Sequence, residues 1–120
     1  MGMKLNEAAM AQAKRLIRDG KVNIESDWSE AQPSPDEEND FLDEHGWESY
    51  GKWYLAFDTE ANEETKGHHN FPYGDFEEVH RDGVIAAKQR AAQNDYTAIE
   101  KAADELLTMI DEQGEDGSGS

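Results

Sequence analysis

The sequence predicts an α+β domain in which a small antiparallel sheet packs against about four helices. Several segments follow the 3.6-residue period of amphipathic helices, while residues 52–58 and 68–72 carry the pattern of a β-hairpin. A chain of 120 residues fits a single compact domain, which we place at residues 1–112. Residues 113–120 are Gly, Ser, Glu, Asp and Gln, and we expect a disordered acidic tail whose Gly-Ser-Gly-Ser ending is typical of a cloning remnant.

The first predicted helix covers residues 6–19, and its apolar side chains recur with the helical period: Ala9, Ala13, Leu16 and Ile17. Asn6 fits the N-cap, and Gly20 fits the left-handed position that follows a helix. Near the C-terminal end, where the helix dipole favours cations, one face carries Lys14, Arg18 and Lys21. That face is either a solvated helix end or a docking face for an acidic partner or for the acidic segment of the same chain.

A short strand is predicted at residues 22–24, followed by a polar connection containing Pro33. The second helix has Ser34 as its N-cap and Pro35 at its first position, and Gly46 is a fitting end. Asp36, Glu37 and Glu38 suit the positive end of its dipole, and Phe41 and Leu42 are its expected buried side.

The hairpin follows this helix. Within residues 52–58 the large apolar side chains of Trp53, Leu55 and Phe57 alternate with Tyr54 and Ala56, so one face of the strand is fully apolar. Residues 59–67 are polar and reverse the chain, and a return strand ends at Pro72.

Three helical segments are predicted after the hairpin. Asp75 is placed as the N-cap of a short turn that carries Phe76, Val79 and His80 and ends near Gly83. Asp82 is a second candidate cap, for the Ala-rich helix 84–93. The last helix, 97–112, opens with the Thr-x-x-Glu pattern of a capping box and packs antiparallel to it over the aromatic strand.

Charge is spread unevenly along the chain. Residues 22–64 hold 14 acidic side chains against the single Lys52, a local balance of −13 within a total of −17. The first 21 residues instead hold five Lys or Arg against two acids. Binding to nucleic-acid phosphates needs a cationic patch, so this balance argues against direct DNA or RNA binding and favours a basic protein partner.

Several classes of site are excluded or unsupported. The chain has no cysteine, which rules out disulfides and thiolate chemistry, and it lacks the glycine motifs of nucleotide-binding loops and hydrolases. His68, His69 and His80 lie close in sequence, but their spacing matches no zinc motif, so we assign no metal ligand, cofactor or catalytic residue. The absence of long apolar runs predicts a cytoplasmic protein that does not enter membranes.

Acidic residues flank the aromatic strand on both sides in sequence, and a sheet covered on one face leaves aromatic side chains on the other. We therefore predict a partner-binding surface made of Asp40, Asp43, Glu44, Trp47, Glu48, Tyr54, Glu60, Glu63, Glu64 and Tyr73. The first hypothesis is a non-enzymatic interaction protein that uses this surface to bind a basic protein.

Three alternatives stay open. The acidity is also typical of halophile-type proteins that have no charge-specific partner. A phage-type mimic of DNA would instead offer carboxylates in place of phosphates to a cationic groove. The last alternative is a metal-dependent enzyme that uses His80, Asp75 and Arg81.

From Trp53 to Ile110 the chain resembles a group of small bacterial and phage-associated proteins. The resemblance lies in an aromatic strand followed by Phe-Pro-Tyr-Gly-Asp-Phe (71–76), Val-His-Arg-x-Gly (79–83) and Arg-Ala-Ala-Gln (90–93). It covers about half of the chain and supports the predicted domain, but it implies no particular activity. The acidic residues 22–50 lie outside it.

Overall fold

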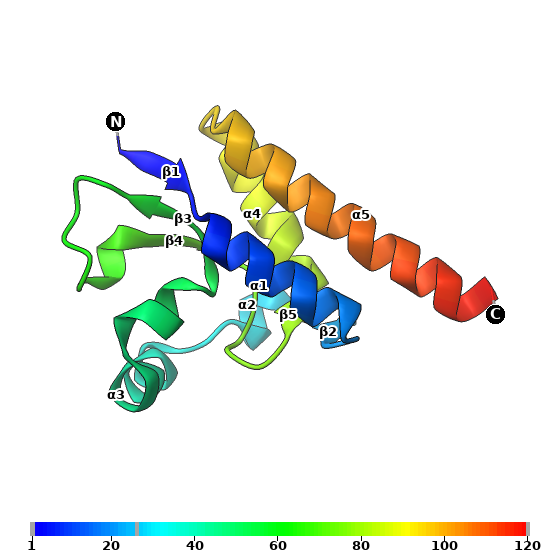
Figure 1. Cartoon of the computed structure of the whole chain (residues 1–120), viewed down its shortest axis with the longest axis horizontal. Coiled ribbons are helices and arrows are strands. Elements are labelled where there is room, and N and C mark those ends of the chain that lie inside the picture. The colour runs from blue at the N-terminus through cyan, green and yellow to red at the C-terminus, as the bar shows by residue number, and fades with distance from the viewer. Residues whose placement is uncertain (1, 26, 120) are drawn as a thin grey trace.

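The computed structural model describes residues 2–25 and 27–119, with side chains described up to residue 113. It shows the expected α+β fold, in which helices surround a three-stranded antiparallel sheet of order β1-β3-β4 (Figure 1). A second, two-stranded sheet joins β2 to β5. Apart from Trp28, the buried apolar side chains form one hydrophobic cluster, as a single compact domain requires.

The predicted hairpin is confirmed. β3 (Tyr54–Asp58) pairs antiparallel with β4 (His69–Pro72), with Ala56 opposite Asn70, and the 3₁₀ turn η1 (Lys66–His68) leads into β4. β3 is the central strand, because β1 (Met3–Leu5) pairs with its other edge. β1 was not predicted, because its three residues are too few to show an alternating pattern.

The N-terminal helix agrees closely with its prediction. α1 spans Glu7–Arg18, the Asn6 side chain accepts a hydrogen bond from Ala9 N at 3.2 Å, and Gly20 follows with a φ of 78°. The short strand after it is also present, as β2 (Val22–Asn23), and it pairs in parallel with β5 (Val79–His80).

Residues 28–31 were predicted as part of a connection but form one helical turn, α2 (Trp28–Ala31). A distant carboxylate holds this turn, because Asp82 Oδ2 accepts a hydrogen bond from Trp28 N at 2.7 Å. Asp82 therefore binds α2 instead of capping its own helix. Local sequence carries no sign of a turn that depends on a residue 54 positions away.

α3 spans Pro35–Gly51 and begins as predicted, with a complete capping box between Ser34 and Glu37. Gly46 adopts φ 83° and ψ 175°, so the helical conformation breaks where an end was predicted. The chain then resumes a helical path to Gly51. This region of φ and ψ is open only to glycine in practice.

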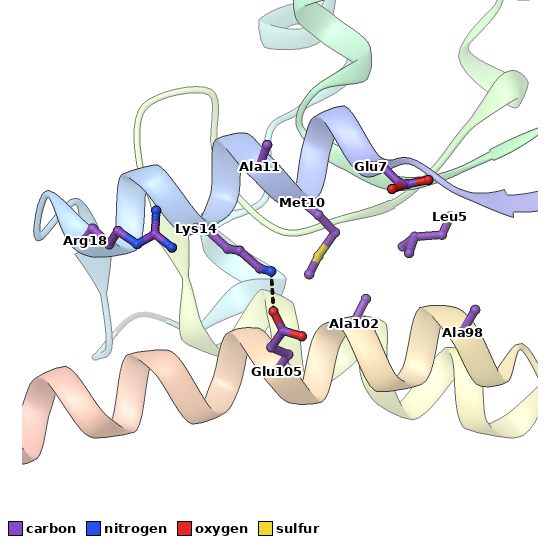
Figure 2. A pocket seen from close by; sticks show the side chains of 9 residues that line it. All are labelled: Leu5, Glu7, Met10, Ala11, Lys14, Arg18, Ala98, Ala102 and Glu105. Atoms are coloured by element: carbon purple, nitrogen blue, oxygen red, sulfur yellow. Dashed lines mark ion pairs between the residues drawn. The ribbon is translucent and has the colours of Figure 1, made fainter.

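The two long C-terminal helices form the predicted antiparallel pair: α4 spans Arg81–Gln93 and α5 spans Thr97–Gly119. α1 lies along α5, where Lys14 and Glu105 form an ion pair over a hollow of about 460 Å³ (Figure 2). The backbone of α5 continues beyond residue 112 and projects past the body of the molecule (Figure 1). Side chains from residue 114 on lie outside the description, so the disordered tail at 113–120 stays a prediction. Among the described residues, no helix combines the length and apolar character needed to cross a membrane.

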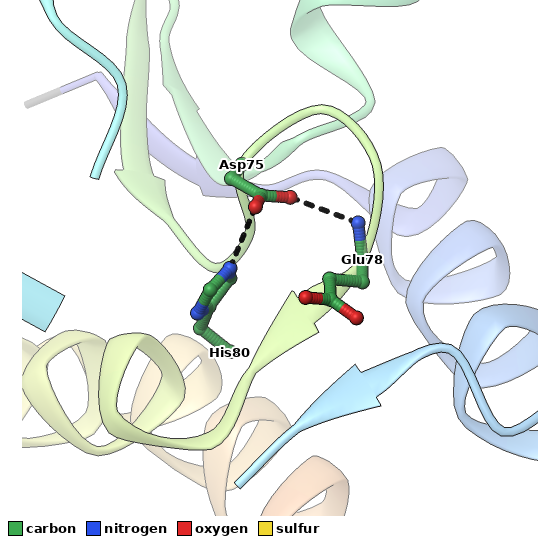
Figure 3. A group of neighbouring side chains, drawn as sticks. All are labelled: Asp75, Glu78 and His80. Atoms are coloured by element: carbon green, nitrogen blue, oxygen red, sulfur yellow. Dashed lines mark hydrogen bonds and ion pairs between the residues drawn. The ribbon is translucent and has the colours of Figure 1, made fainter. Parts of the chain in front are cut away.

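The helical turn predicted at residues 76–82 is wrong. Asp75 Oδ1 does accept a hydrogen bond from Glu78 N at 2.9 Å (Figure 3) and another from Glu77 N at 3.1 Å, as an N-cap would. Phe76, however, has a φ of 72°, which a right-handed helix does not allow, and the chain turns into β5. α4 consequently starts at Arg81, three residues before the predicted start.

Candidate functional site

A hollow of about 510 Å³ lies between the end of α3, the segment that joins β3 to β4, and the start of α1. We call it the acidic hollow. Its lining consists of Asn6, Ala8, Trp47, Glu48, Gly51, Lys52, Glu63, Glu64, His68 and His69.

Four residues of the predicted partner-binding surface meet in the acidic hollow. Trp47 and Glu48 follow the break at Gly46, while Glu63 and Glu64 belong to the segment before β4. The three carboxylates are exposed and Trp47 is half-buried. The structure thus joins two acidic segments that are 15 residues apart in the sequence.

The wall behind the carboxylates is aromatic. The Trp47 and His69 rings are stacked, with centroids 5.6 Å apart and an interplanar angle of 13°. The Tyr50 ring meets both edge-on, at 5.5 Å from Trp47 and 5.2 Å from His69. These contacts fix the orientation of Trp47 beside the acids.

His69 does not offset the negative charge of the hollow. Burial lowers the pKa of His69. This effect outweighs the contact of Nε2 with the Glu63 carbonyl at 3.2 Å, which acts to raise the pKa. Its other ring nitrogen, Nδ1, is buried and has no hydrogen-bond partner among the described residues. With His69 neutral, three carboxylates of the lining face one ammonium group, that of Lys52.

Other acids of the predicted surface do not reach the hollow. Asp40, Asp43 and Glu44 are exposed on the part of α3 before Gly46, and Glu60 is exposed just after β3. None of the four lines the hollow.

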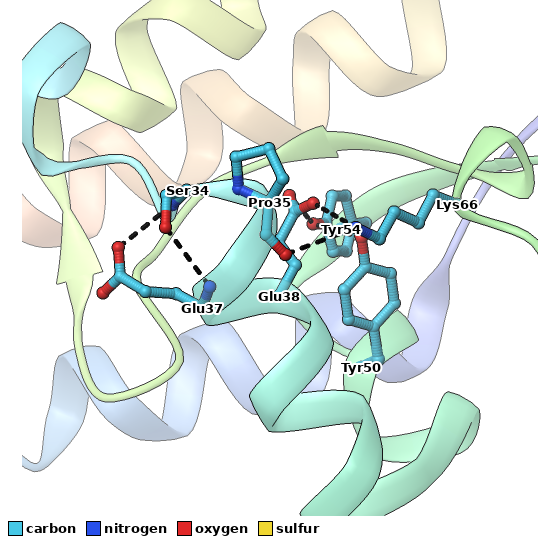
Figure 4. Close-up of polar contacts among 7 residues, drawn as sticks. All are labelled: Ser34, Pro35, Glu37, Glu38, Tyr50, Tyr54 and Lys66. Atoms are coloured by element: carbon cyan, nitrogen blue, oxygen red, sulfur yellow. Dashed lines mark hydrogen bonds and ion pairs between the residues drawn. The ribbon is translucent and has the colours of Figure 1, made fainter.

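The prediction that Tyr54 and Tyr73 belong to an exposed aromatic surface is wrong. Their exposed fractions are 5% and 0%, because Tyr54 packs against Tyr50 of α3, while Tyr73 stacks on Trp53 and its hydroxyl accepts from Gln12 Nε2 of α1 at 3.1 Å. The Tyr54 hydroxyl lies 2.8 Å from the Tyr50 hydroxyl and 3.2 Å from Glu38 Oε2, and Lys66 pairs with the same carboxylate (Figure 4). The Tyr73 hydroxyl donates to Lys52 O at 2.7 Å.

Of the three residues proposed for a metal-dependent enzyme, His80 and Asp75 are in contact but Arg81 points elsewhere. His80 Nε2 lies 2.8 Å from Asp75 Oδ2, but the Arg81 guanidinium turns to Asp111, with Nε 3.0 Å from Oδ1. Burial acts to raise the pKa of Asp75, yet hydrogen bonds from Glu78 N, His80 and Glu77 N hold it below its usual value. His68 and His69 line the acidic hollow, whereas His80 lies beside Trp28.

Sequence reasoning missed several lining residues. His68 and His69 were weighed as metal ligands and as polar turn residues, although their position next to the acidic segment 60–64 was a usable signal. Asn6, Ala8 and Gly51 carry no such signal, since they reach the hollow only through the packing of α1 against the end of α3. The Asn6 side chain donates to Gly51 O at 3.0 Å across that contact.

No family model, curated protein or solved structure matches the chain. The resemblance to small bacterial and phage-associated proteins stays a prediction.

Proposed function

We propose that this chain is a non-enzymatic interaction protein whose acidic hollow binds a lysine- or arginine-bearing segment of a basic protein partner. The observation that carries the proposal is the convergence of Trp47, Glu48, Glu63 and Glu64 on one hollow. Their charge and aromatic character in the sequence predicted a common surface, and the fold brings these four together.

The chemistry of the lining suits a long cationic side chain. The apolar stem of Lys or Arg covers an aromatic ring well while its charged head meets carboxylates. A cation over the face of Trp contributes about 0.5–1 kcal/mol at an exposed site, and each exposed ion pair contributes roughly 0.2–1 kcal/mol. Such terms give weak binding that falls with added salt.

The size of the hollow limits what enters it. Its volume of about 510 Å³ lies within the range of small-ligand sites. One or two side chains fit, so the rest of the partner must lie on the surrounding surface, where Asp40, Asp43 and Glu44 add attraction at longer range.

The test uses octalysine peptide as the probe and calorimetry at about 50 and about 300 mM NaCl as the measurement. Two double variants remove the same charge: Glu63→Gln with Glu64→Gln inside the hollow, and Asp40→Asn with Asp43→Asn outside it. We expect the first variant to bind about 5-fold more weakly, since two exposed ion pairs together contribute about 1 kcal/mol. The second should change affinity by less than about 2-fold at the higher salt.

Tryptophan fluorescence locates the contact. Trp28 and Trp53 are 8% and 7% exposed, so a spectral shift on binding reports mainly on Trp47. Equal losses in the two double variants would assign the binding to overall charge and remove the hollow from the proposal. Absence of binding by octalysine at low salt would overturn the proposed function itself.

A further inference from the structure

A cluster of two carboxylates and a histidine lies apart from the acidic hollow, in the turn before β5 and in β5 itself. One ligand-type atom from each of Asp75, Glu78 and His80 lies within 4.8 Å of the others. The three side chains come from six consecutive residues and point toward a common space (Figure 3).

Hydrogen bonds hold Asp75 more firmly than Glu78. Asp75 Oδ1 accepts from two backbone N–H groups, which leaves Oδ2 directed at His80 Nε2. The side-chain amide of Asn23 donates to Glu78 Oε1 at 3.4 Å, and Asn23 is the partner of His80 in the β2–β5 pair. The Asp75 carboxylate is therefore held in place, as the ligands of metal sites are, whereas the one long contact of Glu78 leaves its side chain able to move.

The histidine and the turn are also constrained. His80 is 3% exposed, and the Trp28 ring lies 5.6 Å from its centroid. Phe76 holds a left-handed φ of 72°, an unfavourable conformation for an aromatic residue, and its ring stacks on Phe41 at 4.4 Å. Backbone strain of this kind gathers at ligand sites, where the surrounding packing maintains it.

We propose that Asp75, Glu78 and His80 bind one divalent first-row transition-metal ion. An imidazole nitrogen with two carboxylate oxygens suits Zn²⁺, whereas Mg²⁺ and Ca²⁺ prefer oxygen ligands alone. Asp75 is about a quarter exposed, so the ion enters from its side and keeps water in its remaining positions.

Binding needs a small rearrangement. Ligand atoms around a tetrahedral zinc ion lie roughly 3.4 Å apart, which follows from metal–ligand distances of about 2.0–2.2 Å. The cluster, now within 4.8 Å, contracts by the movement of the Glu78 side chain. The metal then occupies the position of the proton between His80 Nε2 and Asp75 Oδ2, and the neutral imidazole carries its proton on Nδ1.

The test is a calorimetric titration of the full chain with Zn²⁺ after treatment with chelator. Glu78→Gln removes one ligand, and Glu77→Gln removes the same charge from the exposed neighbouring residue. We expect Glu78→Gln to weaken Zn²⁺ binding at least 10-fold and Glu77→Gln to change it by less than about 2-fold. Asp75→Asn is less useful because Asp75 also closes the turn.

Proton NMR of the four histidines gives a second readout. The first equivalent of Zn²⁺ should shift the ring signals of His80 before those of His68 and His69, while Mg²⁺ leaves them in place. Equal affinities of Glu78→Gln and Glu77→Gln, or His68 and His69 signals that shift ahead of His80, would overturn the proposal. In that case the Asp75–His80 contact only fixes the start of α4.

Discussion

The hydroxyl of Tyr54 shows what a single buried polar atom does in this fold. It lies within hydrogen-bond distance of both the Tyr50 hydroxyl and Glu38 Oε2, and Lys66 Nζ lies 3.2 Å from the other oxygen of Glu38. Burial, followed by the contacts with Tyr50 and Glu38, raises the pKa of Tyr54 far above its ordinary value, so the hydroxyl stays protonated. This contact attaches α3 to the sheet and thereby positions one wall of the acidic hollow.

Tyr54→Phe should lower the free energy of unfolding by about 1–2 kcal/mol, because it removes the hydroxyl and leaves buried polar partners behind. Urea titration measures the change. Tyr96→Phe is the matched control, since the Tyr96 hydroxyl has no hydrogen-bond partner among the described residues and its ring is half-buried. Equal stabilities of Tyr54→Phe and the unaltered chain would show that the hydroxyl does not hold α3.

Among the elements, α3 has the largest effect on the site. Its break at Gly46 redirects the chain, so that Trp47 and Glu48 line the hollow while Asp40 and Asp43 stay outside it. The site therefore depends on one backbone conformation that side-chain-bearing residues rarely adopt.

Gly46→Ala should lower the free energy of unfolding by about 1–3 kcal/mol, the cost of a residue forced into this region of φ and ψ. A Cβ at Gly46 has open space around it, so the loss comes from backbone strain alone. Gly67→Ala is the control, because a Cβ there also meets open space but φ is not positive. If both variants lose equal stability in urea, the break at Gly46 has no special cost.

The sequence predicted the elements that carry their own signals. Caps and periodicity identified α1 and the start of α3, and alternation identified the β3–β4 hairpin. β1 and α2 were missed because each is short and depends on a distant partner. β1 pairs with β3, and α2 is held by Asp82. The turn at Asp75 was misassigned because an N-cap and this turn use the same local hydrogen bonds.

Part of the candidate site could also be predicted from the sequence. Charge and aromatic content selected Trp47, Glu48, Glu63 and Glu64 correctly as neighbours in space. Tyr54 and Tyr73 were placed on the surface because a pattern of alternation cannot tell how many faces of a sheet are covered. Their burial depends on where α3 packs for Tyr54 and where α1 packs for Tyr73, which the whole chain determines.

At the scale of the molecule, the basic N-terminal helix does not neutralise the acidic segment 22–64 through Lys14. Lys14 pairs with Glu105, and two further ion pairs, Arg81–Asp111 and Lys88–Asp104, also join helices outside that segment. Lys66 pairs with Glu38 of that segment, while the carboxylates at the acidic hollow and those of Asp40, Asp43 and Glu44 on α3 are exposed. Mimicry of DNA would need these carboxylates in two rows and stays a prediction.

Self-repulsion from a net charge of −17 predicts a small dependence of stability on salt. The chain should be folded at about 0.15 M NaCl, and about 2 M NaCl should raise its melting temperature by only about 4 °C, equivalent to roughly 1 kcal/mol. NaCl is the right salt because sulfate also strengthens apolar burial. A halophile-type protein would instead be unfolded at the lower concentration.

The Asp40→Asn, Asp43→Asn double variant gives the control. With two fewer negative charges, its melting temperature should rise at low salt and respond less to added NaCl. An unchanged response would mean that repulsion is not the cause.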